Sequence, residues 1–232
     1  MDITEKFLLP FGAKLGEDLI WCQILNRVSP NTSSIALFLD RDGVIVEEVN
    51  YLSKPQDVHL ISGVADVIAH FNNKLIPVIL VTNQAGIGKS KISWGQFAEV
   101  QEKIISELDM KGAFINAVFA CPFHEDAKVP YKVPDHPCRK PNPGMLLKAS
   151  ALMSLNLSDS IIVGDRASDL EAGKNAGLSK GIHVGTGYGS DKAEREMVCQ
   201  LASKEFEIVS LSSIGQLQAE DCLNLLPPEY RD

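Results

Sequence analysis

The sequence predicts an α/β fold of the Rossmann-like type, in which helices cover both faces of a doubly wound, parallel sheet. Two observations carry this prediction: apolar runs rich in β-branched residues recur along the chain, and amphipathic helical patterns lie between them. Near-continuous apolar runs are typical of strands that are buried on both faces. Strand, helix and strand in repeated order indicate right-handed βαβ units, so a ligand should bind at the carboxyl ends of the strands.

Six segments are expected to form strands. They are residues 35–39, 76–81, 115–120, 160–163, 181–184 and, with a weaker pattern, 206–211. Between them, apolar residues recur at helical spacing in two stripes whose role is core packing. The stripes are Val64, Val67, Ile68 and Phe71 in the first and Phe97, Val100, Ile104 and Leu108 in the second.

Local signals place the ends of further helices. Asn142 followed by Pro143 is typical of an N-cap and the first helical position. Ser168 is a candidate cap for a helix that closes near Gly177. The tail after Tyr188 carries a helical pattern, the weak strand, and LSSIGQLQ at 211–218, which we interpret as a capped helix. The strand edge and this helix would complete the sheet.

The chain is expected to form one main domain, residues 35–232, preceded by an extension, residues 1–34, that packs on its core. With 232 residues and 45% hydrophobic content, the chain can bury a full core. The extension contains Trp21 and Cys22, which suit a strand pair or a helix lying on the domain. The segment SPNTSS at 29–34 has the composition of a linker.

Charge and composition narrow the class of function. A net charge of -8 and a pI of about 5.2 argue against sequence-independent binding of nucleic acid, because such binding needs many Lys and Arg side chains. No apolar run is long enough to span a bilayer, and residues 1–16 do not have the pattern of a signal peptide. Five scattered cysteines do not form a secreted disulfide framework. We therefore expect a cytoplasmic, monomeric protein with a small-molecule ligand and no membrane partner.

Polar residues follow the predicted strands where ligands should bind. Because the carboxyl ends of parallel strands meet at one edge of the sheet, these residues should converge. They are Asp40 and Asp42 after the first strand, Thr82, Asn83 and Gln84 after the second, Arg139 and Lys140 before a capped helix, and Asp165 and Asp169 after the fourth.

Clustered carboxylates indicate phosphoryl-transfer chemistry. Three carboxylates of one sign repel each other unless positive charge lies among them. A hard divalent cation with oxygen ligands, Mg²⁺, suits this set, and Lys140 would add a second positive charge. An aspartate held in this way stays ionised and can attack phosphorus, while a carboxylate two residues further along can protonate the leaving oxygen and then activate water. Thr82 and backbone N–H groups would hold the phosphoryl oxygens.

Four segments resemble, in order and spacing, the four motifs of the haloacid dehalogenase (HAD) superfamily of phosphatases. They are DRDGV at 40–44, VTNQAGIGKS at 81–90, CRKPNPGM at 138–145 and VGDRASDLEAGKNAG at 163–177. Within the superfamily the chain is most similar to the branch of the heptose bisphosphate phosphatases and the histidinol-phosphate phosphatase domains. The resemblance covers residues 35–188 and implies a HAD fold with a minimal cap and an open site.

The resemblance also implies roles for the acidic residues. Asp40 would be the nucleophile that becomes an aspartyl-phosphate and would also be a Mg²⁺ ligand. Asp42 would be the general acid and base, with its backbone carbonyl on Mg²⁺. Asp165 would be the other protein ligand of Mg²⁺, and Asp169 would support it. As alternatives from the residues themselves, the aspartates at 40 and 42 also suit a turn, and Asp169 also suits the N-terminus of a helix.

Phosphate and substrate contacts are implied at three further positions. By the same resemblance, Thr82 and Lys140 would bind the transferring phosphoryl group and Arg139 would face the substrate. A solvated surface position remains the alternative for Arg139. Asn83 is a weaker candidate for a phosphate or substrate contact, because Asn83 and Gln84 are also suited to hydrogen-bonding the loop.

A possible zinc site lies in CPFHEDAKVPYKVPDHPCRK at 121–140. Heptose phosphatases carry structural zinc in a loop patterned Cys-x-His and then Cys-x-Cys. Here the four N/S groups are Cys121, His124, His136 and Cys138, enough for a tetrahedral site. Phe123, however, stands at the expected histidine position, and the intervening segment is rich in proline. If zinc is absent, Cys121 is an ordinary strand-end thiol, and His124 or His136 faces the substrate.

These observations predict a Mg²⁺-dependent phosphomonoester hydrolase acting on a small phosphorylated metabolite, with a sugar phosphate or bisphosphate favoured. Histidinol phosphate is the rival substrate, and a non-catalytic module that binds phosphometabolites is the rival from another class. DNA 3'-phosphatases share the motifs, but the acidic charge argues against them. AGIGKSK at 85–91 and GTGYGS at 185–190 match a P-loop and a dinucleotide fingerprint only weakly.

Overall fold

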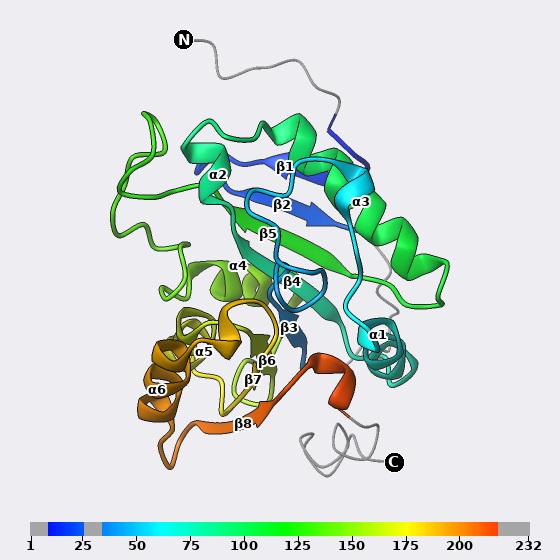
Figure 1. Ribbon diagram of the computed structural model, residues 1–232, viewed down its shortest axis with the longest axis vertical. Coiled ribbons are helices and arrows are strands. Elements are labelled where there is room, and N and C mark those ends of the chain that lie inside the picture. The colour runs from blue at the N-terminus through cyan, green and yellow to red at the C-terminus, as the bar shows by residue number, and fades with distance from the viewer. Residues whose placement is uncertain (1–8, 26–33, 218–232) are drawn as a thin grey trace.

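One sheet runs through the part of the chain that the computed structural model describes, residues 9–25 and 34–217 (Figure 1). Within these ranges it has eight strands in the order β1-β2-β5-β4-β3-β6-β7-β8. They are β1 (Ala13–Leu15), β2 (Trp21–Ile24), β3 (Leu37–Leu39), β4 (Val78–Asn83), β5 (Ala117–Cys121), β6 (Ile161–Gly164), β7 (Lys180–Val184) and β8 (Glu207–Leu211). The last six coincide with the six predicted runs, and the predicted α/β fold is confirmed.

Helices cover both faces of the sheet, as right-handed crossovers between parallel strands require. Helices α1 and α3 lie on one face, and α4, α5 and α6 lie on the other (Figure 1). Their bounds are α1 (Val64–Asn73), α2 (Ala85–Gly88), α3 (Trp94–Asp109), α4 (Gly144–Met153), α5 (Ala167–Asn175) and α6 (Lys192–Leu201). Both predicted apolar stripes are buried, one in α1 and the other in α3.

Strand β3 is the centre of the sheet and delivers the first candidate residue of the site. It pairs in parallel with β4 on one side and with β6 on the other, and its three residues are fully buried. The chain moves from β3 outward to β5 and later outward in the other direction to β8, so the helices on the two faces diverge at the carboxyl end of β3. This divergence opens the crevice in which ligands bind in doubly wound sheets, and Asp40 is the next residue.

The N-terminal segment contributes the antiparallel edge of the sheet. β1 pairs with β2, and β2 pairs with β5, both antiparallel. Trp21 of β2 is fully buried, with its ring 5.5 Å from Trp94 and 5.2 Å from Phe97 of α3. These strands therefore join both the sheet and its core. The predicted linker lies almost entirely outside the described residues.

Several helix ends differ from the prediction. α4 begins at Gly144 with Pro143 as its N-cap, one residue later than expected, and the Asn142 amide instead donates to Asp135 and to the carbonyl of His136. Ser168 lies inside the first turn of α5 and does not cap it. The described part of LSSIGQLQ is a single 3-10 turn, residues 214–216, with the last residue of that stretch outside the described ranges.

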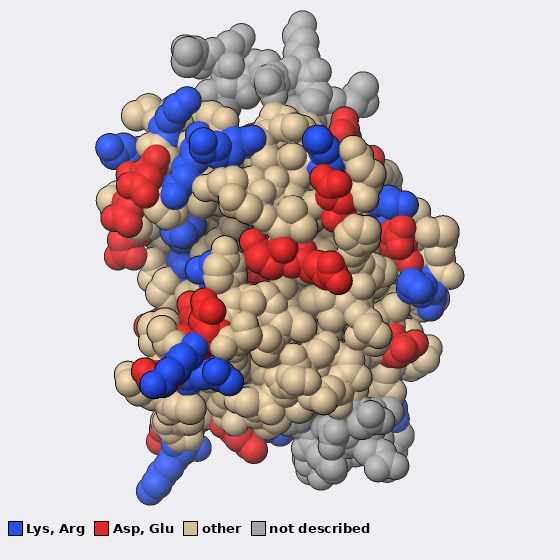
Figure 2. All heavy atoms as spheres, viewed as in Figure 1, with Lys and Arg blue, Asp and Glu red and all other residues tan. Residues whose placement is uncertain are grey.

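Charged side chains of both signs are interspersed on the face shown in Figure 2, and Lys and Arg do not form one continuous surface there. Among the described residues, no helix has both the length and the apolar composition needed to cross a membrane.

Candidate active site

The polar residues after the strands converge on one cleft of about 580 Å³. Asp40 follows β3, Thr82 belongs to β4, and Asp165 follows β6. Asp169 comes from the first turn of α5, and Lys140 from the loop that leads into α4. The parallel register brings these residues to the same edge, as the sequence predicts.

Three buried carboxylates form the acidic centre of the cleft. Asp40, Asp165 and Asp169 place oxygens within 4.8 Å of one another, and their exposures are 8%, 1% and 1%. Burial, reinforced by the charges of Asp40 and Asp169, raises the pKa of Asp165 to about 8. Burial also raises the pKa of Asp169 to about 6, with the opposing charge of Lys140 limiting the rise. The carboxylates therefore need more positive charge than the surrounding protein supplies.

Lys140 is the cation built into this centre. Its Nζ donates to Asp40 Oδ1 at 2.8 Å and to the carbonyl of Val81 at 2.8 Å, and it lies 2.7 Å from Asp169 Oδ1. Burial by itself would lower the pKa of Lys140, but the charges of Asp169 and Asp40 outweigh it and raise this pKa. The ammonium group thus has three acceptors, and it lies between the carboxylates of Asp40 and Asp169.

Asn83 positions this lysine. Its amide donates to the carbonyl of Lys140 at 3.0 Å and accepts from the N–H of Lys140 at 3.1 Å. Asn83, a weaker candidate for a phosphate contact, therefore binds the backbone of the loop. It holds Lys140, which lies 57 residues further along the sequence.

Gln84 and Arg41 hold Asp42, and neither was assigned this role from the sequence. Gln84 Nε2 donates to Asp42 Oδ2 at 3.0 Å and to Thr82 Oγ1 at 2.9 Å. Arg41 donates to both oxygens of Asp42, with Nη2 2.9 Å from Oδ2, and its guanidinium lies 5.4 Å from the centre of the Phe97 ring. Arg41 is 1% exposed, so the carboxylate of Asp42 also neutralises a buried charge.

The acidic centre fits a Mg²⁺ ion. The donors are hard carboxylate oxygens, and three of them face a single lysine, which leaves an excess of negative charge for a divalent cation. Asp165 Oδ2 also accepts the N–H of Tyr188 at 2.7 Å, which fixes the orientation of that carboxylate. The carboxylate of Asp42 does not belong to this group of oxygens.

Gly43 and Gly187 leave room for the carboxylate of Asp165, and Gly43 gives a test. At Gly43, with φ +79°, an added Cβ would overlap Asp165 Oδ2. Gly112 has a similar φ of +75° but no atom within 4 Å of such a Cβ. Both alanine variants should lose about 1 kcal/mol of stability through backbone strain. We expect only Gly43→Ala to weaken Mg²⁺ binding, by about 10- to 100-fold, because it displaces a ligand.

Isothermal titration with MgCl₂ and urea unfolding of the two variants measure these effects separately. Equal Mg²⁺ affinities in Gly43→Ala and Gly112→Ala would contradict the placement of the ion against Asp165.

The rim of the cleft carries further charged groups. Arg139 lines it, as predicted, and donates from Nη1 to the carbonyl of Phe123 at 3.0 Å. Arg166 also lines it, with its guanidinium 3.6 Å from the centre of the Tyr188 ring. Burial, followed by the charges of Asp42 and Asp40, raises the pKa of Glu48 to about 7. Neither Arg166 nor Glu48 was singled out from the sequence, although Arg166 directly follows Asp165 after β6.

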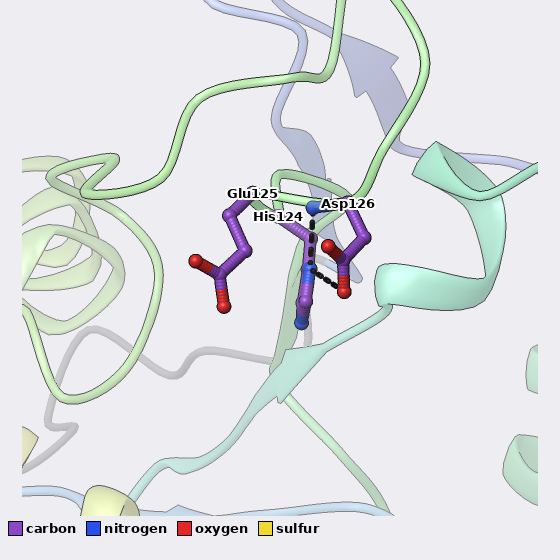
Figure 3. A group of neighbouring side chains, drawn as sticks. All are labelled: His124, Glu125 and Asp126. Atoms are coloured by element: carbon purple, nitrogen blue, oxygen red, sulfur yellow. Dashed lines mark hydrogen bonds and ion pairs between the residues drawn. The ribbon is translucent and has the colours of Figure 1, made fainter.

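The four predicted zinc ligands do not converge. Among the described residues, no three of Cys121, His124, His136 and Cys138 bring ligand atoms within 4.8 Å of one another. His124 instead lies between the carboxylates of Glu125 and Asp126, and its Nδ1 accepts the N–H of Asp126 at 3.0 Å (Figure 3). His124 also lines the cleft.

Comparison with known proteins agrees with this geometry. Residues 137–204 match a family model described as HAD-hydrolase-like. A D-glycero-beta-D-manno-heptose-1,7-bisphosphate 7-phosphatase from Mesorhizobium japonicum is 45% identical over 168 residues, which cover 72% of this chain and 77% of that protein. A D-glycero-alpha-D-manno-heptose-1,7-bisphosphate 7-phosphatase from Photorhabdus laumondii is 39% identical over 65% of this chain and 82% of that protein.

Solved structures give the same result. A HAD-like phosphatase from Mesorhizobium loti superposes with a TM-score of 0.76 at 36% identity, over 91% of this chain and 93% of that one. The D,D-heptose 1,7-bisphosphate phosphatase from B. bronchiseptica, complexed with magnesium and phosphate, superposes with a TM-score of 0.68 at 26% identity, over 82% of this chain and 99% of that one.

The fold, the carboxylate centre and these matches define a hydrolase of the HAD-like class. A sequence identity of 45% over 77% of a relative's length indicates membership of the same family and not only a shared fold. The chain therefore belongs to the heptose bisphosphate phosphatase family of the haloacid dehalogenase superfamily, and it is a phosphatase.

Proposed function

We propose that this protein is a Mg²⁺-dependent phosphatase that removes the 7-phosphate of a D-glycero-D-manno-heptose 1,7-bisphosphate through an aspartyl-phosphate on Asp40. The observation that carries the proposal is the placement of Asp40 at the end of the central strand, with Oδ1 held by Lys140 and its carboxylate grouped with those of Asp165 and Asp169. The activities for which the relatives are named support the choice of substrate.

The proposed reaction uses two carboxylates in sequence. Asp40, held by Lys140, attacks phosphorus as the ester P–O bond breaks. Asp42 gives its proton to the leaving sugar oxygen and then takes a proton from the water that hydrolyses the aspartyl-phosphate, which releases inorganic phosphate. Thr82 and nearby backbone N–H groups hold the phosphoryl oxygens. Asp40, Asp165 and the carbonyl of Asp42 would hold Mg²⁺, which would neutralise charge on the transferring group.

The rim would recognise the second phosphate of the substrate. Arg139 and Arg166 both line the cleft and both carry fixed positive charge, whereas the centre is acidic. Guanidinium groups bind phosphate through paired N–H donors. We assign the distal phosphate to this pair, and this assignment favours a bisphosphate over histidinol phosphate, which has a single phosphate. Zinc has no part in the proposed reaction.

Phosphate release from a panel of esters tests this function. The panel contains the α and β anomers of heptose 1,7-bisphosphate, heptose 7-phosphate and histidinol phosphate, each with Mg²⁺ and with EDTA. We expect Mg²⁺-dependent release, with kcat/KM highest for a bisphosphate. Faster release from histidinol phosphate would favour that substrate instead. Binding without release from any ester would identify a non-catalytic phosphometabolite-binding module.

A further inference from the structure

Two aromatic rings stack face to face in the loop between β5 and α4, which carries both Arg139 and Lys140. Phe123 and His136 have ring centroids 3.7 Å apart and planes inclined by only 4°. Tyr131 packs edge-on against Phe123, with centroids 5.6 Å apart, and its hydroxyl accepts from Trp94 Nε1 at 3.0 Å. The stack is therefore connected to α3 and to the core through the side chain of Tyr131.

Both members of this stack also hold Arg139 through their backbone carbonyls. The carbonyl of Phe123 accepts from Arg139 Nη1 at 3.0 Å, and the carbonyl of His136 accepts from the N–H of Arg139 at 2.8 Å. The first bond fixes the guanidinium and the second fixes the backbone. Arg139 is thus hydrogen-bonded to the backbone of both residues whose rings stack.

The loop does not fit the zinc site that its resemblance to the family implies. His136 Nδ1 accepts the N–H of Cys138 at 3.1 Å, and its ring lies flat on Phe123. His124 Nδ1 accepts a backbone N–H in the same manner. Among the described residues, no three of the four N/S side chains of this loop bring ligand atoms within 4.8 Å of one another.

We propose that the stacked pair of Phe123 and His136 replaces a structural metal in this loop and positions Arg139 for substrate binding. In this arrangement Phe123 is a stacking partner, although the family pattern has a zinc ligand at its position. His136 is the other partner and is a positioning residue, not a ligand. The kinetic consequence rests on the proposed function, whereas the metal content does not.

Two substitutions separate stacking from metal binding, because each removes one property and keeps the other. His136→Phe removes a candidate zinc ligand and preserves a stacked ring. Phe123→Leu preserves all four N/S groups and most of the buried volume but removes the π face. Phe123→Tyr retains the ring and serves as the conservative rescue. Zinc is measured by plasma mass spectrometry on each purified full-length protein, and kinetics are measured with heptose 1,7-bisphosphate and Mg²⁺.

We expect no stoichiometric zinc in the wild type and a KM within about twofold of wild type in His136→Phe and Phe123→Tyr. In Phe123→Leu we expect KM to rise about threefold to tenfold, with kcat changed less than about twofold, since an aromatic pair contributes this much beyond its buried area. Circular dichroism confirms that each variant is folded.

One zinc per wild-type chain that His136→Phe loses would overturn the inference, as would an unchanged KM in Phe123→Leu. If the wild type releases no phosphate from any ester, the proposed function fails separately. In that case zinc content and the effect of EDTA on the melting temperature still decide whether the loop depends on a metal.

Discussion

Lys140→Met is expected to lower the free energy of unfolding by about 3–5 kcal/mol and to remove nearly all activity. The lysine is 3% exposed and pairs with two buried carboxylates, so its loss leaves Asp40 and Asp169 without a cation in a poorly hydrated site. Urea unfolding at neutral pH measures the change in stability, and phosphate release measures the activity.

A surface pair provides the control for this substitution. Lys103 and Glu107 lie 2.8 Å apart on α3, and the lysine side chain is 40% exposed, so Lys103→Met should change stability by less than about 1 kcal/mol. Adding Asp169→Asn to Lys140→Met should recover part of the lost stability, because it removes one uncompensated charge. A loss below about 1 kcal/mol in Lys140→Met alone would show that water or another cation already neutralises the carboxylates.

Asp40→Asn is expected to reduce kcat by about 10⁴-fold or more, because it removes the attacking oxygen. The same substitution should leave stability unchanged or raise it. It removes one of three mutually repelling carboxylates, while Lys140 keeps Asp169 as a partner. Asp40→Asn and Lys140→Met therefore change the same site, but only Lys140→Met should lower stability, and urea unfolding distinguishes them.

Asp42→Asn is the companion variant for the nucleophile. We expect its kcat to fall by about 10²- to 10⁴-fold, the range for loss of a general acid and base. Arg41 would lose its ion pair, so this variant should also be less stable than wild type. Residual turnover in Asp40→Asn equal to that of Asp42→Asn would contradict the assignment of separate roles.

The sequence predicted the fold and the centre of the site because both follow from rules that act locally. The buried strands β3, β4 and β6 are followed by or end in polar residues, and parallel pairing brings those ends together. Asp40 and Asp165 are found where this argument places them, and Lys140 joins them from the loop before α4. No such rule applies to the N-terminal segment, because a short apolar segment suits a strand pair or a helix equally. Its pairing with the edge of the sheet could therefore not be predicted.

The positions that could not be predicted depend on contacts between distant residues. Asn83 has the same local sequence whether its amide faces phosphate or the backbone of Lys140, and the choice is made by a loop 57 residues away. Arg41 looks like a solvent-exposed arginine at a strand end, yet it is buried between Asp42 and the ring of Phe97. Likewise, four N/S side chains in one loop do not reveal that His136 lies flat on Phe123.

The most direct test of the central claim is to trap the covalent intermediate. The wild-type protein is mixed with heptose 1,7-bisphosphate and Mg²⁺, quenched rapidly, and treated with borohydride, which reduces an aspartyl-phosphate to homoserine. Peptide mass spectrometry should then find homoserine at position 40, and Asp40→Asn should give none. Homoserine at another aspartate, or turnover with no modified aspartate, would contradict Asp40 as the nucleophile.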